Sequence, residues 1–202
     1  MDLLTISETT WRGMEAWRIR APRLDLVVTR IGGHLASLSD AGSSRTPLWQ
    51  PQWAASDPAT VREGGAYGSG PEARLLATIV GHNWCCDRFG APWPGEARPL
   101  HGEVAIVPFT LQRDIPSRAT WTAWLPETRL HVKQTIEVDG EAVRLVHAVA
   151  HDDAEAREVE WAEHVNVAGD FLDGVRFAAG VDRVLNWPKD TDEVTRFASY
   201  PP

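Results

Sequence analysis

Polar and titratable side chains are concentrated between residues 81 and 103 of this sequence. Imidazole, amide, guanidinium and carboxylate groups can hydrogen-bond a polyhydroxylated ligand, and imidazoles and carboxylates can also transfer a proton. Glycines at 81, 90 and 102 predict a bent backbone that brings these groups together. We interpret the segment as a polar hairpin that lines a binding site; a polar surface loop beside a buried Trp84 is the alternative. The candidate residues are His82, Asn83, Arg88, His101 and Glu103.

A second segment that could carry chemistry is the predicted strand at residues 160–167. Alternate side chains of a strand point to opposite faces. His164 would therefore share a polar face with Glu160, while Glu163 would share the face of Trp161. A buried Glu163 would need a hydrogen-bonding partner. Most single histidines on strands are solvated side chains, but the carboxylates beside His164 make it a candidate for proton transfer.

The composition limits the partners and the compartment. A chain of 202 residues fits one domain, expected at 1–202. The net charge of −8, without a cluster of Lys and Arg, argues against nucleic acid. We find neither a secretory signal nor a run of ~18 apolar residues that would span a membrane. Cys85 and Cys86 are neighbours, which suits neither a disulfide framework nor a zinc motif, so we expect a cytoplasmic protein.

Ten tryptophans are many for this length, and most should fill the core. Four of them lie among Pro, Gly and polar residues, where their rings could instead stack on a flat apolar ligand face. Burial under long loops is the alternative. These four are Trp49, Trp53, Trp84 and Trp93.

The periodicity of the chain is that of strands, and we predict an all-β fold of antiparallel sheets. The clearest element is a hairpin at 129–149 around an Asp139-Gly140 turn. Paired glycines at 32 and 33 predict a bulge or a close backbone approach, and residues 39–74 a long functional loop. Further strands are expected at 24–38, 104–111 and 119–125. Only 71–80 and 154–159 could form short helices, and neither has a sustained 3.6-residue period.

Several motifs, in one order along nearly the whole chain, resemble the aldose 1-epimerase family, also called galactose mutarotases, and in particular its divergent bacterial members. Each motif alone is short, so the specificity lies in the ordered set. The matching segments are IGGHLASL at 31–38, PLW at 47–49, GHN at 81–83, CDRFG at 86–90, LHGE at 100–103 and WAEHV at 161–165.

The resemblance implies a β-supersandwich and an enzyme that interconverts the α and β anomers of a free hexose without a cofactor or a metal. By position, His164 resembles the family's acid, which protonates the ring oxygen; a pKa near ~6.5 suits that task. His101 resembles the second histidine, which holds the substrate, and Arg88 the arginine that anchors sugar hydroxyls. The other predicted sugar-binding residues are His82, Asn83, Glu103 and Trp49.

The main departure from the family concerns the catalytic base. Family members are longer, and their base is a glutamate on a strand near the C-terminus, whereas this chain stops at Pro202 after a turn-like stretch. We therefore expect either a truncated form that lacks the C-terminal strands or a protein that has lost the base. Glu163 or Glu160 could substitute, although Glu163 should face away from His164. Missing strands would leave an open sheet edge, which favours self-association.

Three alternatives to a sugar isomerase stay open. The first is a carbohydrate-binding protein without catalysis, because the base is absent. The second is a metal-dependent or cupin-like protein with His82, His101, Glu103 and His164 as ligands, although their spacing matches no tight ligand motif. The third is a β-domain whose polar cluster is only structural.

Overall fold

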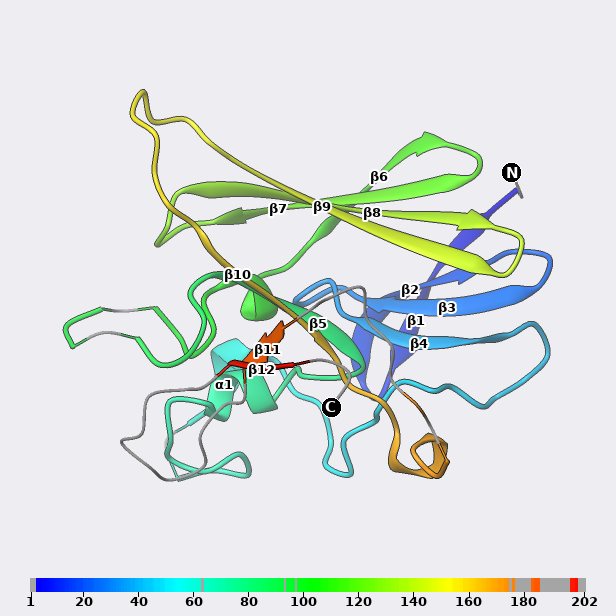
Figure 1. Ribbon diagram of the computed structural model, residues 1–202, viewed down its shortest axis with the longest axis horizontal. Helices are drawn as coiled ribbons and strands as arrows, with labels where there is room; N and C mark the ends of the chain where they lie inside the picture. The colour runs from blue at the N-terminus through cyan, green and yellow to red at the C-terminus, as the bar shows by residue number, and fades with distance from the viewer. Residues whose placement is uncertain are drawn as a thin grey trace. The chain divides into compact units, whose positions relative to one another are not determined.

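Alternating apolar and polar side chains give the first part of the chain two antiparallel sheets, seen in the computed structural model as two layers (Figure 1). The sandwich is therefore all-β, as the periodicity predicts. The larger sheet has the order β1 (Thr5–Trp11), β2 (Met14–Arg20), β3 (Leu24–Thr29), β4 (Leu35–Asp40), β5 (His82–Asp87) and β10 (Glu160–Val165). The smaller sheet has the order β6 (Thr110–Ile115), β7 (Arg118–Leu125), β8 (Leu130–Asp139) and β9 (Ala142–His151).

The structure describes residues 3–62, 64–92, 94–96, 98–174 and 176, and the backbone of two short strands near the C-terminus. By its internal contacts the chain divides into two compact units, Met1–Gly169 and Asp170–Pro202. The second unit contains the antiparallel pair β11 (Arg183–Leu185) and β12 (Phe197–Ser199). Trp93 and the Pro201-Pro202 ending lie outside the described residues.

The core lies between the two sheets of the first unit. Trp17 of β2 and Trp121 of β7 meet there, with ring centroids 5.8 Å apart. Both rings are buried, together with the inward-facing aliphatic side chains of β2, β3, β7 and β8. Each fully buried large apolar side chain contributes roughly 1.5–3 kcal/mol through its removal from water. Trp84 and Cys86 of β5 belong to this core, which sets the face of β5 that points inward.

The predicted hairpin is confirmed as β8 and β9, whose register runs from Leu130↔His151 to Asp139↔Ala142. Its two loop residues are Gly140 and Glu141, one position later than the predicted turn, and Gly140 has the positive φ that such turns require. Predictions around 24–38, 119–125 and 160–167 are confirmed as β3 with β4, β7 and β10. The paired glycines lie in the turn between β3 and β4, and a Cβ on Gly32 would lie 2.6 Å from the Ala105 carbonyl oxygen, which confirms the predicted close backbone approach. The register shift of this strand pair lies elsewhere, between Val27 and Val28.

Three local predictions need correction. Residues 104–106 form a 3-10 helix, η2 (Val104–Ile106), so the strand predicted over 104–111 begins only at Thr110. A buried apolar run does not by itself distinguish a strand from a helical turn. Residues 154–159 are not helical and are mostly exposed, so no packing stabilises a helix there. Residues 81–103 are a strand followed by a long loop rather than a hairpin.

Two of the remaining helical segments lie in the long connection between β4 and β5. They are η1 (Pro58–Thr60) and α1 (Ala73–Leu76), which confirms the short helix predicted within 71–80; η3 (Gly169–Phe171) follows β10. None of the helices in the described part of the chain is long and apolar enough to cross a membrane.

Candidate functional site

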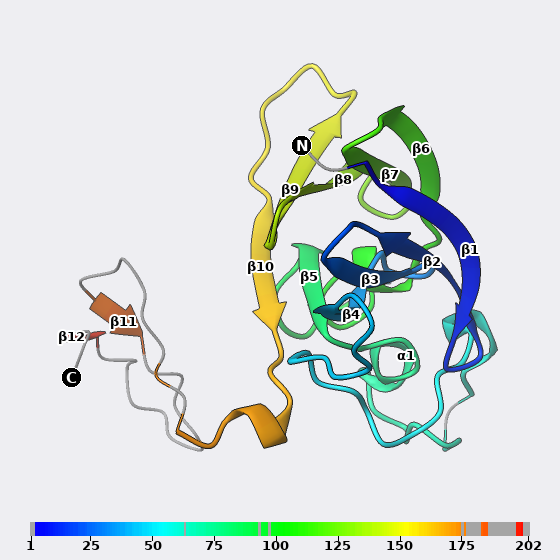
Figure 2. The ribbon, with the colours of Figure 1, turned by 90° about the vertical axis from the view of Figure 1, so that its right-hand side faces the viewer.

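The site is built on the pairing of β5 with β10, which Figure 2 shows side by side. Their register places Trp84 opposite Glu163 and Asn83 opposite His164. Because directly paired residues share a face, the pair has two faces. The inner face, toward the smaller sheet, carries His82, Trp84, Cys86, Trp161, Glu163 and Val165; the outer face carries Asn83, Cys85, Glu160, Ala162 and His164.

Two histidines meet on the outer face. The ring of His101, from the loop after β5, lies 5.4 Å from the ring of His164. His164 Nε2 lies 3.2 Å from the Sγ of Cys85, which is almost completely buried. The half-exposed ring of Phe89 packs against both, at 5.3 Å from His101 and 5.9 Å from His164. The structure thus brings together the two residues predicted to be catalytic.

Glycine allows the loop to reach this position. Gly102 has a φ of 80°, and a Cβ there would lie 2.3 Å from the Cys86 carbonyl oxygen, so only glycine lets the loop lie against β5. His101 itself has a φ of 62°, which is uncommon outside glycine. It is held by a reciprocal pair of hydrogen bonds: the Gly90 N–H donates to His101 Nδ1 at 3.0 Å, and the His101 N–H donates to the Gly90 carbonyl at 2.9 Å.

The Gly90 hydrogen bond also decides which nitrogen of His101 carries the proton. Because Nδ1 accepts, a neutral His101 carries its hydrogen on Nε2 and presents an N–H donor. Burial lowers the pKa of His101 below the usual 6.5, and the nearby His164 lowers it further. His101 is therefore mainly neutral at pH 7.

Cys85 on β5 and His164 on β10, which are in contact, are also uncharged near pH 7. Burial lowers the pKa of His164; the Glu163 carboxylate opposes this shift and His82 adds to it. Burial raises the pKa of the Cys85 thiol to about 12, with a further contribution from Glu163. A thiol that stays protonated is a poor nucleophile, so the Cys85–His164 contact is not the activated pair of a cysteine hydrolase.

Asn83 lies beside His164 on the outer face and is only 2% exposed. Within the part of the chain that the structure describes, its amide Nδ2 has no hydrogen-bond partner. Buried amide groups are normally satisfied, so an unused donor on the strand partner of His164 suggests a position for a ligand oxygen.

His82 points to the inner face, away from His101 and His164. Its Nε2 lies 2.8 Å from Glu163 Oε2, while Glu163 Oε1 lies 2.8 Å from Nδ1 of His147 on β9. His147 continues through its Nε2 to Gln134 on β8 at 2.9 Å. Burial would raise the pKa of Glu163, but the hydrogen bonds from His147 and His82 outweigh it and lower that pKa to about 2. Glu163 is thus paired, as the strand pattern predicts, and connects the two sheets.

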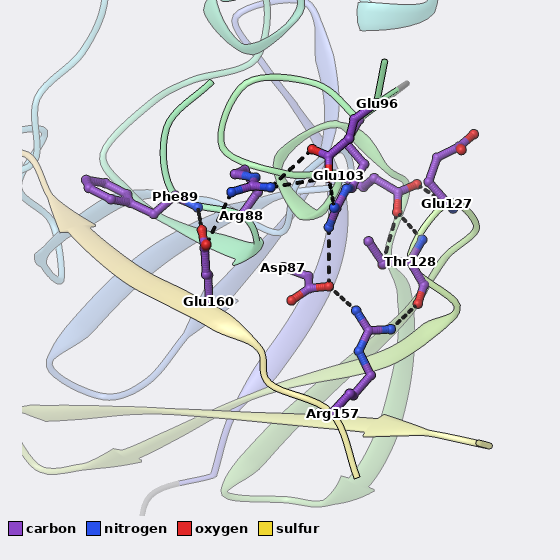
Figure 3. A network of polar contacts seen from close by, with 10 residues as sticks. Asp87, Arg88, Phe89, Glu96, Glu103, Glu127, Thr128, Arg157 and Glu160 are labelled. Carbon is purple, nitrogen blue, oxygen red and sulfur yellow. Dashed lines mark hydrogen bonds and ion pairs between the residues drawn. The ribbon is translucent and has the colours of Figure 1, made fainter. Parts of the chain in front are cut away.

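Arg88 lies in a network of charged side chains beneath the loop (Figure 3). Its guanidinium is buried and contacts Glu96 at 3.1 Å and Glu160 at 3.2 Å. Glu160 also accepts the Phe89 N–H at 2.8 Å. Arg98 bridges Glu96 and the buried Asp87. The network places Arg88 as a support for the loop, with its charge balanced by carboxylates.

The same network holds the loop to the smaller sheet. Arg157, in the exposed connection between β9 and β10, pairs with Asp87 and donates to the Thr128 carbonyl at 2.7 Å. Glu103 is 3% exposed, and its carboxylate accepts the backbone N–H groups of Glu127 and Thr128 at 3.0 and 2.9 Å. Glu103 therefore anchors the turn between β7 and β8, and the structure does not bring it to the outer-face histidines.

Trp49 is half-buried and packs edge-on against Trp53, with ring centroids 5.7 Å apart. The Trp49 N–H donates a hydrogen bond to the Asn166 carbonyl, and the Trp49 carbonyl accepts one from the Gly81 N–H. These two bonds fix Trp49 near the start of β5 and the end of β10. Trp84, in contrast, is a core residue on the inner face, stacked on His147 at 4.3 Å. Its burial therefore excludes Trp84 from the tryptophans that could stack on a ligand.

Among the described residues, one group has ligand atoms close enough for a metal ion, all within 4.8 Å of one another: Cys85, His101 and His164. It differs from the set suggested by sequence, since His82 and Glu103 face elsewhere. His101 fits a metal poorly. A metal on Nε2 would require the proton on Nδ1, where Gly90 already donates, whereas metal-bound histidines usually donate from their other nitrogen.

Three residues of this region are not predicted from the sequence: Cys85, His147 and Arg157. Only the period-2 pattern of β5 could have indicated that Cys85 shares a face with His164, and only if the strand pairing had been known. No protein-family model matches this chain, and no curated protein matches it. The likeness to aldose 1-epimerases rests on the sequence motifs.

Proposed function

We propose that this protein binds a free sugar on the outer face of β5 and β10 and interconverts its anomers by acid–base ring opening, as the resemblance to aldose 1-epimerases implies. One observation carries the proposal: the imidazoles of His101 and His164 lie 5.4 Å apart on one face. The unused amide donor of the buried Asn83, the strand partner of His164, supports it.

Ring opening transfers one proton from the C1 hydroxyl to the ring oxygen while the bond between C1 and the ring oxygen breaks. His164 is assigned this proton transfer, because an imidazole can release and recover a proton near neutral pH. His101 presents a fixed N–H and is assigned to hold and polarise a sugar oxygen. Rotation of the opened C1 aldehyde followed by the reverse transfer closes the other anomer.

The charges around the site favour a neutral sugar over a sugar phosphate. Arg88, Arg98 and Arg157 are each paired with carboxylates. Binding a phosphate dianion would require breaking one of these pairs, which leaves a buried carboxylate without its partner. Glucose and galactose are therefore the substrates to examine first.

A carbohydrate-binding protein without catalysis is the second candidate, and one observation favours it. In the described part of the chain, neither carboxylate suggested as the base is available on the outer face: Glu163 is bonded on the inner face, and Glu160 is held by Arg88 and the Phe89 N–H. This candidate predicts that sugars change the tryptophan fluorescence while the anomers interconvert at the uncatalysed rate.

Polarimetry of freshly dissolved α-glucose and α-galactose distinguishes the candidates. We expect the protein to accelerate mutarotation, and His164→Ala to lower the acceleration by about 10²–10⁴-fold, the usual contribution of an acid–base group. His131→Ala is the control, because His131 lies on the exposed side of β8 with Asp152 as its partner.

Two results would count against the isomerase. An unchanged rate for His164→Ala would remove the role assigned to this histidine. Wild-type protein that binds sugar by fluorescence titration, yet leaves mutarotation at its uncatalysed rate, would establish the binding protein instead.

A further inference from the structure

We propose that Cys85 is a positioning residue: its sulfur holds Nε2 of His164, so that His164 exchanges its proton with the sugar through Nδ1. This inference rests on the proposed function and assigns the part played by a residue that the sequence motifs do not include. Its basis is the 3.2 Å contact between Cys85 Sγ and His164 Nε2.

The strand register brings these two side chains together. Cys85 lies directly opposite Ala162, and His164 follows two residues later on β10, so the pair is a diagonal neighbour across the two strands. Ala162 has only a methyl group, which leaves the imidazole room to lean toward the sulfur. The contact is therefore a consequence of regular strand pairing and does not depend on a loop.

Burial leaves one ring nitrogen of His164 facing the protein and the other available to a ligand. Cys85 is 1% exposed, so the nitrogen that faces its sulfur is directed into the protein. Nδ1 is the nitrogen left for a ligand. The other groups that influence this imidazole are His101 and Phe89 from the loop, and Glu163 and His82 through their charges.

A thiol suits an imidazole that must both give and accept a proton. With the sulfur as acceptor, a neutral His164 keeps its hydrogen on Nε2, and Nδ1 has a free electron pair that can take the proton of the C1 hydroxyl. Nδ1 then holds this proton until it passes to the ring oxygen, while Nε2–H continues to donate to the sulfur. A carboxylate could also accept from Nε2–H, but it would raise the pKa of the imidazole by stabilising the charged ring.

The test compares Cys85→Ala and Cys85→Ser with Cys86→Ala in the full-length protein. Serine keeps a group that can donate or accept, whereas alanine removes it. Cys86 is the matched control, because it is an equally buried neighbouring thiol on the inner face. Two measurements are made: the pH profile of glucose mutarotation, and the tautomer of His164 from ring nitrogen chemical shifts in ¹⁵N-histidine-labelled protein without sugar.

We expect Cys85→Ala to mix the tautomers of His164, to shift the acid limb of the pH profile, and to slow mutarotation by about 10–100-fold through misplacement of the ring. Cys85→Ser should restore a single tautomer and most of the rate. Cys86→Ala should change neither the profile nor the tautomer, whatever its effect on stability.

The outcomes separate this inference from the proposed function. An unchanged tautomer and pH profile in a folded Cys85→Ala protein would overturn the role of the thiol, even if mutarotation is catalysed. A tautomer that depends on Cys85 in a protein without mutarotase activity would support the positioning contact while contradicting the isomerase. Failure of Cys85→Ala to fold leaves the comparison of Cys85→Ser with wild type, where a lost tautomer preference would overturn the inference.

Discussion

On the inner face of β5 and β10, His82 and His147 both bond the carboxylate of Glu163, whereas on the outer face His101 and His164 lie beside each other with a backbone amide and a thiol as partners. The inner histidines lie between two sheets and help to hold them together. On the outer face, His101 belongs to the loop after β5 and His164 to β10, and burial lowers the pKa of each.

The difference shows that the partner decides what a histidine can do. A carboxylate partner fixes the imidazole in one hydrogen-bonded arrangement, which suits a structural contact between sheets. A weakly polar thiol or an amide N–H orients the ring without fixing its charge, which suits proton transfer near neutral pH. His164 and Glu163 are adjacent in sequence, yet the alternation of a strand gives them different hydrogen-bonding partners on opposite faces.

We expect the largest loss of stability from Gly102→Ala. This substitution tests the outer face, because Gly102 lies in the loop that carries His101. The new Cβ would meet the Cys86 carbonyl oxygen at 2.3 Å in a left-handed conformation, so we expect a loss of about 2–4 kcal/mol. Chemical denaturation measures it. Gly95→Ala is the control, because Gly95 has a φ of 89° but no atom within 4 Å; equal losses for both variants would contradict the close approach of the loop to β5.

A smaller effect is expected from Glu163→Gln on the inner face. The folded pKa of Glu163 is about 2 and its ordinary value 4.5, so its stabilisation is complete above pH 4.5 and is lost as the pH falls toward 2. The side chain is 37% exposed, so solvent screening reduces the contribution to about 1 kcal/mol.

The measurement is urea unfolding of wild type and Glu163→Gln between pH 6 and pH 2. The difference in the free energy of unfolding should shrink as the pH falls. A difference that is constant over this range would show that the Glu163 charge contributes nothing to the contact between the sheets. Glu160→Gln provides the corresponding change on the outer face.

The smallest expected effect is self-association through β10, the strand at one edge of the larger sheet. β10 is the last strand of the larger sheet in the described part of the chain, and Val165 on it is 64% exposed. We expect weak self-association through this edge, detectable by analytical ultracentrifugation as a concentration-dependent mass. Val165→Lys should abolish it, because a charge on an edge strand opposes pairing with a second strand. A wild-type protein that stays monomeric at all concentrations would contradict this expectation.

Local patterns predicted the parts of the fold that depend on neighbours in sequence. The hairpin of β8 and β9, the faces of His164 and Glu163 and the need for a partner at Glu163 all follow from period-2 alternation and turn chemistry. The pattern failed at 104–111, because the apolar run there is buried as a 3-10 turn before the strand begins.

The site itself could be predicted only in part, because its contacts join distant segments. Residue type and likeness to a family predict His101 and His164, and the fold brings them together. The same two criteria predict Arg88 and Glu103, but Arg88 pairs with Glu96 and Glu160, and Glu103 is bonded to the turn between β7 and β8. Sequence spacing cannot reveal that a side chain already forms an ion pair or a hydrogen bond with a neighbouring carboxylate or amide.

The exposed connection between β9 and β10 also divides the proposed site along the chain. Cys85 and His101 precede it, His164 follows it, and the residues around Arg157 within it are open to solvent. A break in this connection would leave the larger sheet to be completed by a separate peptide that contains β10. If the proposed activity is present, mutarotation would report fragment complementation, because the peptide would bring His164, the histidine proposed to transfer the proton, to a fragment that supplies the remaining groups of the site.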